Sequence, residues 1–214
     1  MSVFRDRRDA GRVLARHLAR YANVPEVLVL GLPRGGVPVA YEVAAALHVP
    51  LDVHVVRKLG FPGHEELAVG AIASGGSVIL DQDLSGGLTK AQLDAVIRRE
   101  FAELNRRESI YRIARPALSV KGKIVILVDD GLATGATMHA AVRSVRSLGA
   151  KRIVVAVPVS SQQAIDSFRG EADEVVAAQI PDAFCAVGLY YDDFRQTSDE
   201  EVEALLRSTL PKAS

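Results

Sequence analysis

Short, continuous apolar runs alternate along this chain with longer segments whose apolar residues recur at helical spacing. The apolar runs cover residues 27–31, 51–56, 124–128, 152–157 and 174–178. Helical spacing predicts helices over residues 9–21, 37–47, 137–148, 162–168 and 199–210. Strands that are apolar throughout are typical of sheets buried on both faces, and their alternation with helices indicates parallel strands. We therefore predict an α/β fold over residues 1–214: a single doubly wound domain whose mostly parallel sheet carries helices on both faces.

A hairpin and a charged helix interrupt this alternation. Residues 68–72 and 78–80 are short apolar runs on either side of two glycines, which predicts an antiparallel hairpin. Residues 89–114 form the most charged segment, yet their apolar residues recur at helical spacing. Thr89 is suited to cap this helix, and Pro116 marks its end. We predict a charged helical insertion at about 89–114, whose surface is solvated or packs on a partner.

Charge and composition narrow the function classes. Lys and Arg together number 26, as do Asp and Glu, so the chain lacks the broad positive field that nucleic-acid or anionic-membrane binding requires. Its single cysteine, Cys185, excludes a disulfide within the chain and fits a reducing compartment. No apolar run reaches the about 20 residues of a membrane span, and the first residues lack the apolar core of a signal peptide. We expect a cytoplasmic protein that binds neither nucleic acid nor membrane.

The segment from Val125 to Thr137 is the strongest candidate site. An apolar strand ends in two adjacent acids, Asp129 and Asp130, which can bind different hydroxyls of one sugar, or one of them can turn back to hold the loop. The small residues that follow let backbone N–H groups approach an anion at the start of a helix, where the helix dipole favours negative charge. This loop consists of Ala133, Thr134, Gly135, Ala136 and Thr137. Acids beside a phosphate cradle suit a sugar phosphate, although an ordinary glycine-containing turn with an acidic edge is the alternative.

This segment closely resembles the motif with which type I phosphoribosyltransferases bind 5-phosphoribosyl-1-pyrophosphate (PRPP). The shared pattern is four apolar residues, two acids, two or three variable residues, and then Thr/Ser-Gly-x-Thr/Ser; no Gly-x-x-x-x-Gly-Lys-Ser/Thr motif occurs as a competitor. The resemblance implies that Asp129 and Asp130 lie along the ribose 2′- and 3′-hydroxyls in catalytic roles. It implies that residues 133–137 cradle the 5′-phosphate, that Mg²⁺ is the cofactor, and that the chain forms a homodimer.

One position departs from the hypoxanthine branch of the family. Those enzymes carry an Asp where Ala133 stands, as proton acceptor for the purine, whereas the adenine branch has Ala. The base contact therefore cannot be assigned from this position. Taken whole, the chain is similar to uncharacterised bacterial phosphoribosyltransferase-like proteins.

Two other strand ends carry candidate anion-binding residues. Arg34, Gly35 and Gly36 follow the first strand, where glycines expose backbone amides and arginine offers a planar fork to phosphate oxygens. The resemblance assigns them to pyrophosphate, although they also fit a plain turn. The second strand ends in Arg57 and Lys58, which resemble the Arg-Lys pair of adenine and orotate phosphoribosyltransferases that faces pyrophosphate. Lys58 is also a candidate for a catalytic role.

The stretch that follows is the candidate lid. Residues 60–63 are rich in glycine and can serve as hinges for a loop that closes over the site. His64, Glu65 and Glu66 come next, and His64 is the candidate acid/base group; a solvated loop is the alternative.

A C-terminal hood is expected at about 181–197, where aromatic residues concentrate. It loosely resembles the base-binding hood of hypoxanthine-type enzymes. By that resemblance Phe184 stacks on a base, Val187 offers backbone groups to it, and Asp192 approaches the metal, which is otherwise held through PRPP and water. The alternative is that these aromatics pack a C-terminal helix against the sheet.

The resemblance implies a Mg²⁺-dependent glycosyltransferase of nucleotide metabolism. It would transfer phosphoribose from PRPP to a nitrogenous base or amine and release pyrophosphate. The alternatives are a non-catalytic regulatory protein that binds PRPP or a nucleotide, and a scaffold retained for assembly. The acceptor cannot be read from the sequence, because fold analogy says little about specificity.

Overall fold

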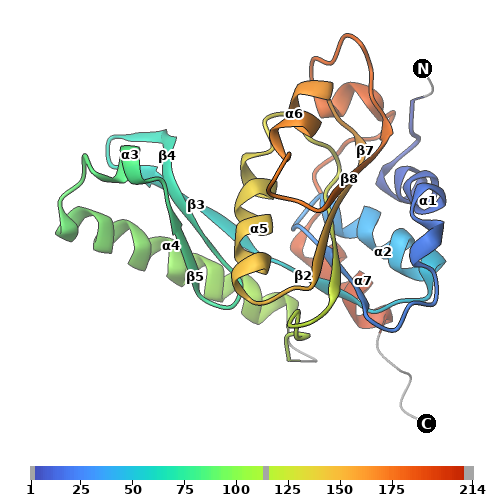
Figure 1. The fold of residues 1–214 in the computed structure, drawn as a ribbon, viewed down its shortest axis with the longest axis horizontal. Helices are drawn as coiled ribbons and strands as arrows, with labels where there is room; N and C mark the ends of the chain where they lie inside the picture. Colours follow the sequence, from blue (N-terminus) through green and yellow to red (C-terminus); the bar gives the residue numbers. More distant parts are fainter. Residues whose placement is uncertain (1–2, 113–115, 210–214) are drawn as a thin grey trace.

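The body of the protein is a parallel sheet of five strands in the order β2-β1-β6-β7-β8, seen in a computed structural model that describes residues 3–112 and 116–209 (Figure 1). The strands are β1 (Val27–Gly31), β2 (Leu51–Val53), β6 (Ile124–Val128), β7 (Arg152–Val159) and β8 (Glu174–Gln179). Strand β2 lies on one side of β1, at one edge of the sheet, whereas β7 and β8 follow β6 toward the opposite edge. The strand order therefore reverses between β1 and β6, and in open α/β sheets ligands bind beyond the carboxyl ends at such a point.

Helices cover both faces of this sheet, as the apolar runs predicted. One face carries α1 (Arg7–His17), α2 (Gly36–Leu47) and α7 (Asp199–Ser208). The other carries α5 (Ala136–Ser147) and α6 (Gln162–Ser167). A short 3₁₀ turn, η1 (Ala19–Tyr21), extends α1. The predicted doubly wound α/β fold is confirmed, while the expected end of the last helix at residue 210 lies outside the described residues.

Alternate residues of each strand belong to different halves of the core. In β6, Ile126 and Val128 pack with α1, α2 and α7, whereas Val125 and Leu127 pack with α5 and α6. All four side chains are inaccessible to solvent. Successive strand residues point to opposite faces, so a strand with helices on both faces must be apolar throughout.

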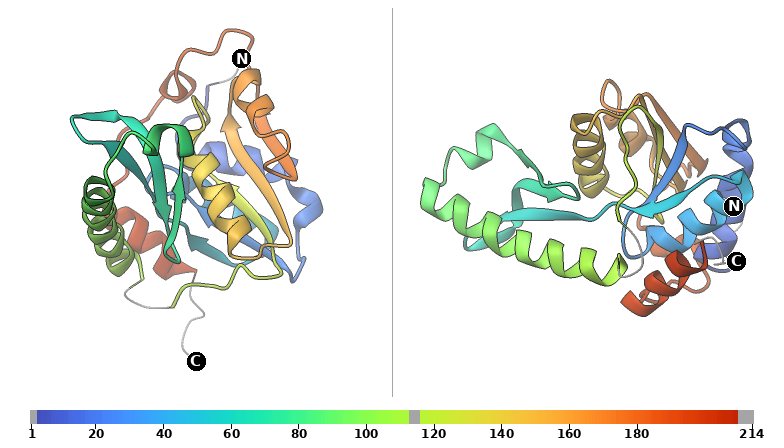
Figure 2. Two further views of the ribbon diagram at one scale, coloured as in Figure 1. Left: turned by 60° about the vertical axis from the view of Figure 1, so that its left-hand side comes forward. Right: turned by 90° about the horizontal axis from the view of Figure 1, so that it is seen from below.

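An arm, defined here as residues 56–111, projects from the body (Figures 1 and 2). It contains an antiparallel sheet of β3 (Val56–Phe61), β4 (His64–Ala73) and β5 (Ser77–Leu80), followed by α3 (Gln82–Ser85) and α4 (Lys90–Tyr111). The predicted hairpin is β4–β5. Thr89 caps α4 in a reciprocal box with Gln92, as its sequence suggested, and the expected extension of this helix to residue 114 lies outside the described residues.

The prediction of one strand over residues 51–56 is wrong. The expected strand over 51–56 is split, because β2 ends at Val53 in the parallel sheet and β3 begins at Val56 in the arm. Residues 60–63, expected to supply hinges for a lid, lie at the tip of a hairpin in which Phe61 pairs with His64, and closure of this tip over the site stays a prediction. Backbone pairing between β3 and β4 overrides the local preference of glycine for a loop.

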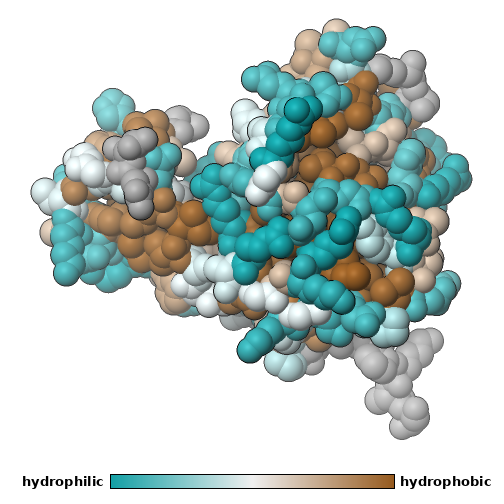
Figure 3. Space-filling model, in the orientation of Figure 1, coloured by the Kyte–Doolittle hydropathy of each residue, from teal (hydrophilic) through white to brown (hydrophobic). Residues whose placement is uncertain are grey.

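Helix α4 packs on the arm's sheet, and the arm, helix included, keeps apolar residues at its surface (Figure 3). Val78, Leu80 and Phe101 are 43%, 37% and 38% exposed. None of the helices in the described part of the chain combines the length and apolar character needed to cross a membrane.

Candidate functional site

A cavity of about 160 Å³ lies at the carboxyl end of β6, next to the reversal of strand order. Three segments far apart in sequence form its walls, and one of them runs from the end of β6 into α5. They contribute Lys58 from the arm, Asp129, Gly131 and Leu132 after β6, Ala133, Thr134, Gly135, Ala136, Thr137 and Met138 around the start of α5, and Val187 from the C-terminal segment. The fold thus brings Lys58, Asp129, the whole loop of residues 133–137 and Val187 to one place.

The loop of residues 133–137 leads directly into α5. Gly135 has a φ of +72°, and a Cβ there would lie 3.2 Å from the Phe168 ring, so this turn requires glycine. No side chain among the described residues caps the helix. Its first backbone N–H groups therefore lack a side-chain partner beside the cavity, and Thr134 and Thr137 add hydroxyls to the lining. This is the arrangement that binds anions at helix N-termini.

The two adjacent aspartates occupy different surroundings. Asp129 lines the cavity, and its Oδ1 accepts a hydrogen bond of 2.9 Å from the backbone N–H of Asp130. Burial, together with the neighbouring charge of Asp130, raises the pKa of Asp129 well above its ordinary value. Asp130 is outside the lining, because its Oδ2 accepts a 2.8 Å hydrogen bond from Arg7 Nε. Burial raises the pKa of Asp130 as well, while the Arg7 guanidinium opposes the rise.

The glycines after β1 pack directly on this acid pair. A Cβ on Gly36 would lie 2.6 Å from the backbone oxygen of Val128 and 2.9 Å from Asp129 Cα. A Cβ on Gly35 would meet Asp130 Oδ2 at 2.1 Å. Arg34 instead directs its guanidinium to Asp199 at the start of α7, with Nη1 and Oδ1 4.0 Å apart. Arg34 is therefore not part of the cavity lining in this structure.

Arg57 and Lys58, expected to act together, lie on opposite faces of β3. Arg57 donates to Glu100 of α4 at 2.7 Å and 3.0 Å, and Glu100 is buried. Lys58 is exposed and makes no ion pair with any residue that the structure describes. It lines the cavity at β6 and also a second cavity of about 380 Å³ beside α4, whose lining includes Thr137. Lys58 is thus the cation available to a ligand, since Glu100 already neutralises Arg57.

The remaining candidates are more scattered. His64 is exposed at the tip of the β3–β4 hairpin and does not line the cavity, so its acid/base role stays a prediction. Phe184 stacks on Tyr190, with ring centroids 5.8 Å apart, beside the short 3₁₀ helix η2 (Val187–Tyr190). Asp192 is exposed and outside the lining, and its backbone N–H donates to Phe4. From the expected hood, only Val187 reaches the cavity.

Two residues at the site were not anticipated from the sequence. Arg7 comes from the N-terminal helix, 123 positions from the carboxylate that it binds. The Tyr191 hydroxyl donates a 2.6 Å hydrogen bond to the backbone oxygen of Asp130, and burial raises the pKa of this hydroxyl. Arg7 stands in no motif, and Tyr191, although it lies within the expected hood, carries no local signal that would pair it with Asp130.

The residues at the cavity fit a magnesium ion that is held mainly by the ligand and by water. The part of the chain that the structure describes contains no group of three or more His, Cys, Asp or Glu residues that could hold a metal by themselves. Mg²⁺ commonly uses one or two carboxylates together with substrate phosphates and water. A single carboxylate at the cavity, Asp129, fits an ion held chiefly through the ligand's own oxygens.

Comparisons with known proteins identify the family of this chain. Residues 6–193 match the family model described as phosphoribosyl transferase domain. A protein of Mycobacterium tuberculosis that is provisionally named a phosphoribosyl transferase is 50% identical over 208 residues, which are 96% of this chain and 47% of that protein. The chain thus spans about half the length of the curated relatives it matches.

Solved structures agree as well. The crystal structure of TT1426 from Thermus thermophilus is 46% identical with a TM-score of 0.87, and the match covers 99% of this chain and 100% of that one. The AQ2163 protein from Aquifex aeolicus, 14% identical with a TM-score of 0.51 over 85% of this chain and 78% of that one, shares the fold alone.

Proposed function

The chain belongs to the phosphoribosyl transferase family, and from that premise we propose that it is a Mg²⁺-dependent phosphoribosyltransferase. Its substrates would be PRPP and a nitrogenous base or amine, and pyrophosphate would be released. The observation that carries the proposal is the single cavity in which Asp129, Lys58 and the loop of residues 133–137 meet. A carboxylate, a cation and a helix N-terminus match the hydroxyls, the pyrophosphate and the 5′-phosphate of one ligand.

Each part of the cavity has a chemical use in this reaction. The first turn of α5 and the hydroxyls of Thr134 and Thr137 would hold the 5′-phosphate. Asp129 would accept hydrogen bonds from the ribose hydroxyls. Loss of pyrophosphate from C1′ leaves positive charge on the ribose, which the Asp129 carboxylate would stabilise strongly because it is largely screened from water.

Charge on the departing pyrophosphate needs a cation that acts more in the transition state than in the ground state. Lys58 would supply it, because this residue lines the cavity and its ammonium group makes no ion pair within the described residues. When bound, Mg²⁺ would add further neutralisation through phosphate oxygens and water. Val187 puts the C-terminal segment at the cavity wall, so the acceptor would bind on that side.

One observation favours the rival function, a regulatory protein that binds PRPP or a nucleotide without turnover. Of the three cations expected at pyrophosphate, Arg34 faces Asp199 and Arg57 is paired with Glu100. Only Lys58 remains for the leaving group, and a binding protein needs less charge there than an enzyme. The homodimer and the cytoplasmic location stay predictions under either function.

The deciding experiment incubates the protein with PRPP, Mg²⁺ and a panel of nucleobases and amines, and measures pyrophosphate release together with PRPP binding by calorimetry. Asp129→Asn should lower kcat/KM about 100-fold, in the range seen when one transition-state contact is lost. Asp166→Asn is the matched control and should leave turnover unchanged, because this α6 carboxylate is 42% exposed, pairs with Arg169 and lies outside the cavity lining. Binding without release from any acceptor would favour the regulatory protein, and absence of binding would refute both functions.

A further inference from the structure

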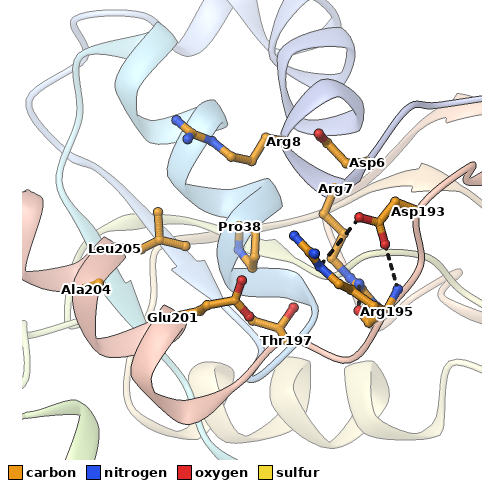
Figure 4. Close-up of a pocket in the computed structure, with 10 residues that line it drawn as sticks. All are labelled: Asp6, Arg7, Arg8, Pro38, Asp193, Arg195, Thr197, Glu201, Ala204 and Leu205. Atoms are coloured by element: carbon orange, nitrogen blue, oxygen red, sulfur yellow. Dashed lines mark hydrogen bonds and ion pairs between the residues drawn. The ribbon is translucent and has the colours of Figure 1, made fainter.

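Arg7 in the first turn of α1 is held by three separate contacts. Its side chain is only 12% exposed, and its Nε donates to Asp130 Oδ2 at 2.8 Å. Its Nη1 donates to the backbone oxygen of Arg195 at 2.7 Å (Figure 4). The guanidinium also lies 4.1 Å from the centroid of the Phe194 ring. Arg7 therefore ties the N-terminal helix to the acid pair and to the C-terminal segment at once.

Asp130 is enclosed from the other sides as well. Its side chain is 17% exposed, and a Cβ on Gly35 would lie 2.1 Å from its Oδ2 and 3.1 Å from Arg7 Nε, so the loop after β1 closes over the ion pair. The Tyr191 hydroxyl holds the Asp130 backbone oxygen. The backbone N–H of Asp130 in turn donates to the carboxylate of Asp129. A chain of contacts thus runs from Arg7 through Asp130 to the carboxylate that faces the cavity.

We propose that Arg7 is a positioning residue of the phosphoribosyltransferase site. It holds Asp130 turned back from the cavity, and the Asp130 backbone then orients the Asp129 carboxylate toward the ribose. The two acids accordingly have different roles, because Asp129 contacts the ligand and Asp130 fixes the geometry of the loop. This inference rests on the proposed function.

The physical reason is the cost of an unpaired buried charge. Two adjacent carboxylates repel each other, and removing one partner of a buried pair leaves the other uncompensated. Without the guanidinium, Asp130 would have to move toward water or take up a proton, and either change would disturb the peptide that orients Asp129. On its far side Arg7 lines a separate cavity of about 300 Å³ together with residues such as Pro38 and Leu205 (Figure 4). Shortening Arg7 therefore enlarges that cavity, which does not include the ribose site.

The test is a double-mutant cycle on PRPP binding, measured by calorimetry, with kcat and KM alongside. Arg7→Met should weaken binding about tenfold, within the range of coupling between contacting residues. Asp130→Asn added to Arg7→Met should restore most of this loss, because it removes the unpaired carboxylate. Arg7→Lys keeps the charge and should bind PRPP better than Arg7→Met. The control is Arg12→Met on the same helix, a 44% exposed side chain whose partners Asp9 and Glu42 keep their ion pairs with Arg5 and Arg8, and this change should leave PRPP binding unaltered.

A merely structural Arg7 would give a different pattern, since its loss would persist unchanged in the Asp130→Asn background. Equal losses in both backgrounds would therefore overturn the proposal, while relief by Asp130→Asn would support it. If Arg7→Met unfolds below the assay temperature, Arg7→Lys with and without Asp130→Asn carries the same cycle. Failure of the unaltered protein to bind PRPP would overturn the proposed function and this inference together. Normal binding with additive losses would overturn the inference alone.

Discussion

Replacing Gly36 by alanine tests how closely the start of α2 must approach the acid pair. The new Cβ would lie 2.6 Å from the Val128 backbone oxygen and 2.9 Å from Asp129 Cα, and backbone atoms cannot swing aside as a side chain can. Overpacking of this kind costs about 1–3 kcal/mol. Alanine stabilises a helix by at most about 1 kcal/mol relative to glycine, so the steric clash is the larger effect. We expect Gly36→Ala to destabilise the protein by about 1–2 kcal/mol.

Thermal unfolding and PRPP calorimetry measure the two consequences. For a chain of this length the loss corresponds to a fall of about 2–8 °C in Tm. Because Asp129 Cα is one of the atoms that must move, PRPP binding should weaken about tenfold, as small misplacements in a site do. Gly87→Ala is the control, since the nearest atoms to its Cβ are 3.6 Å away, and it should change stability by less than about 0.5 kcal/mol.

If Gly36→Ala behaves like Gly87→Ala in both assays, the packing between the loop after β1 and the end of β6 is looser than the contacts indicate. A loss of stability with unaltered PRPP binding would show that Gly36 packs tightly on the end of β6 but that this packing does not position Asp129.

Two further predictions concern other charged groups. Burial, with the nearby charge of Arg112, lowers the pKa of His54 from 6.5 to about 4, so the unfolded chain binds more protons between these values. The free energy of unfolding should be highest above pH about 6.5 and should fall by up to about 3 kcal/mol toward pH 4. Urea unfolding at pH 7 and pH 5 measures this fall, which should be smaller for His54→Gln than for the unaltered protein. Arg57→Met should destabilise the protein by about 1–3 kcal/mol, because it leaves the buried Glu100 with the exposed Arg99 as its remaining partner, and Glu100→Gln should recover part of that loss in urea titrations. Unchanged stability with weaker PRPP binding would instead make Arg57 a ligand-binding residue.

Local patterns in the sequence decided much of the architecture. The apolar runs at 27–31 and 124–128 coincide with β1 and β6, because a strand between two helical layers has no polar face. The start of α4 was predictable because a capping box is made by residues three positions apart. The loop of residues 133–137 and Asp129 were predictable for a similar reason, since they are contiguous and a strand delivers them directly to the carboxyl edge of the sheet.

Contacts between distant segments decided the rest. Which sheet β3 joins depends on its pairing with β4 rather than on its own residues, and that pairing places the glycine-rich residues 60–63 at the tip of a hairpin. The same strand sends Arg57 to Glu100 and Lys58 to the cavity, although the two residues are adjacent and alike in charge. The roles of Asp129 and Asp130 diverge because Arg7, 123 positions away, binds only one of them. The periodicity of a sequence shows which face of a helix or strand is buried. Which oppositely charged residue pairs with a buried charge depends on the tertiary fold, because the two residues can be far apart in sequence.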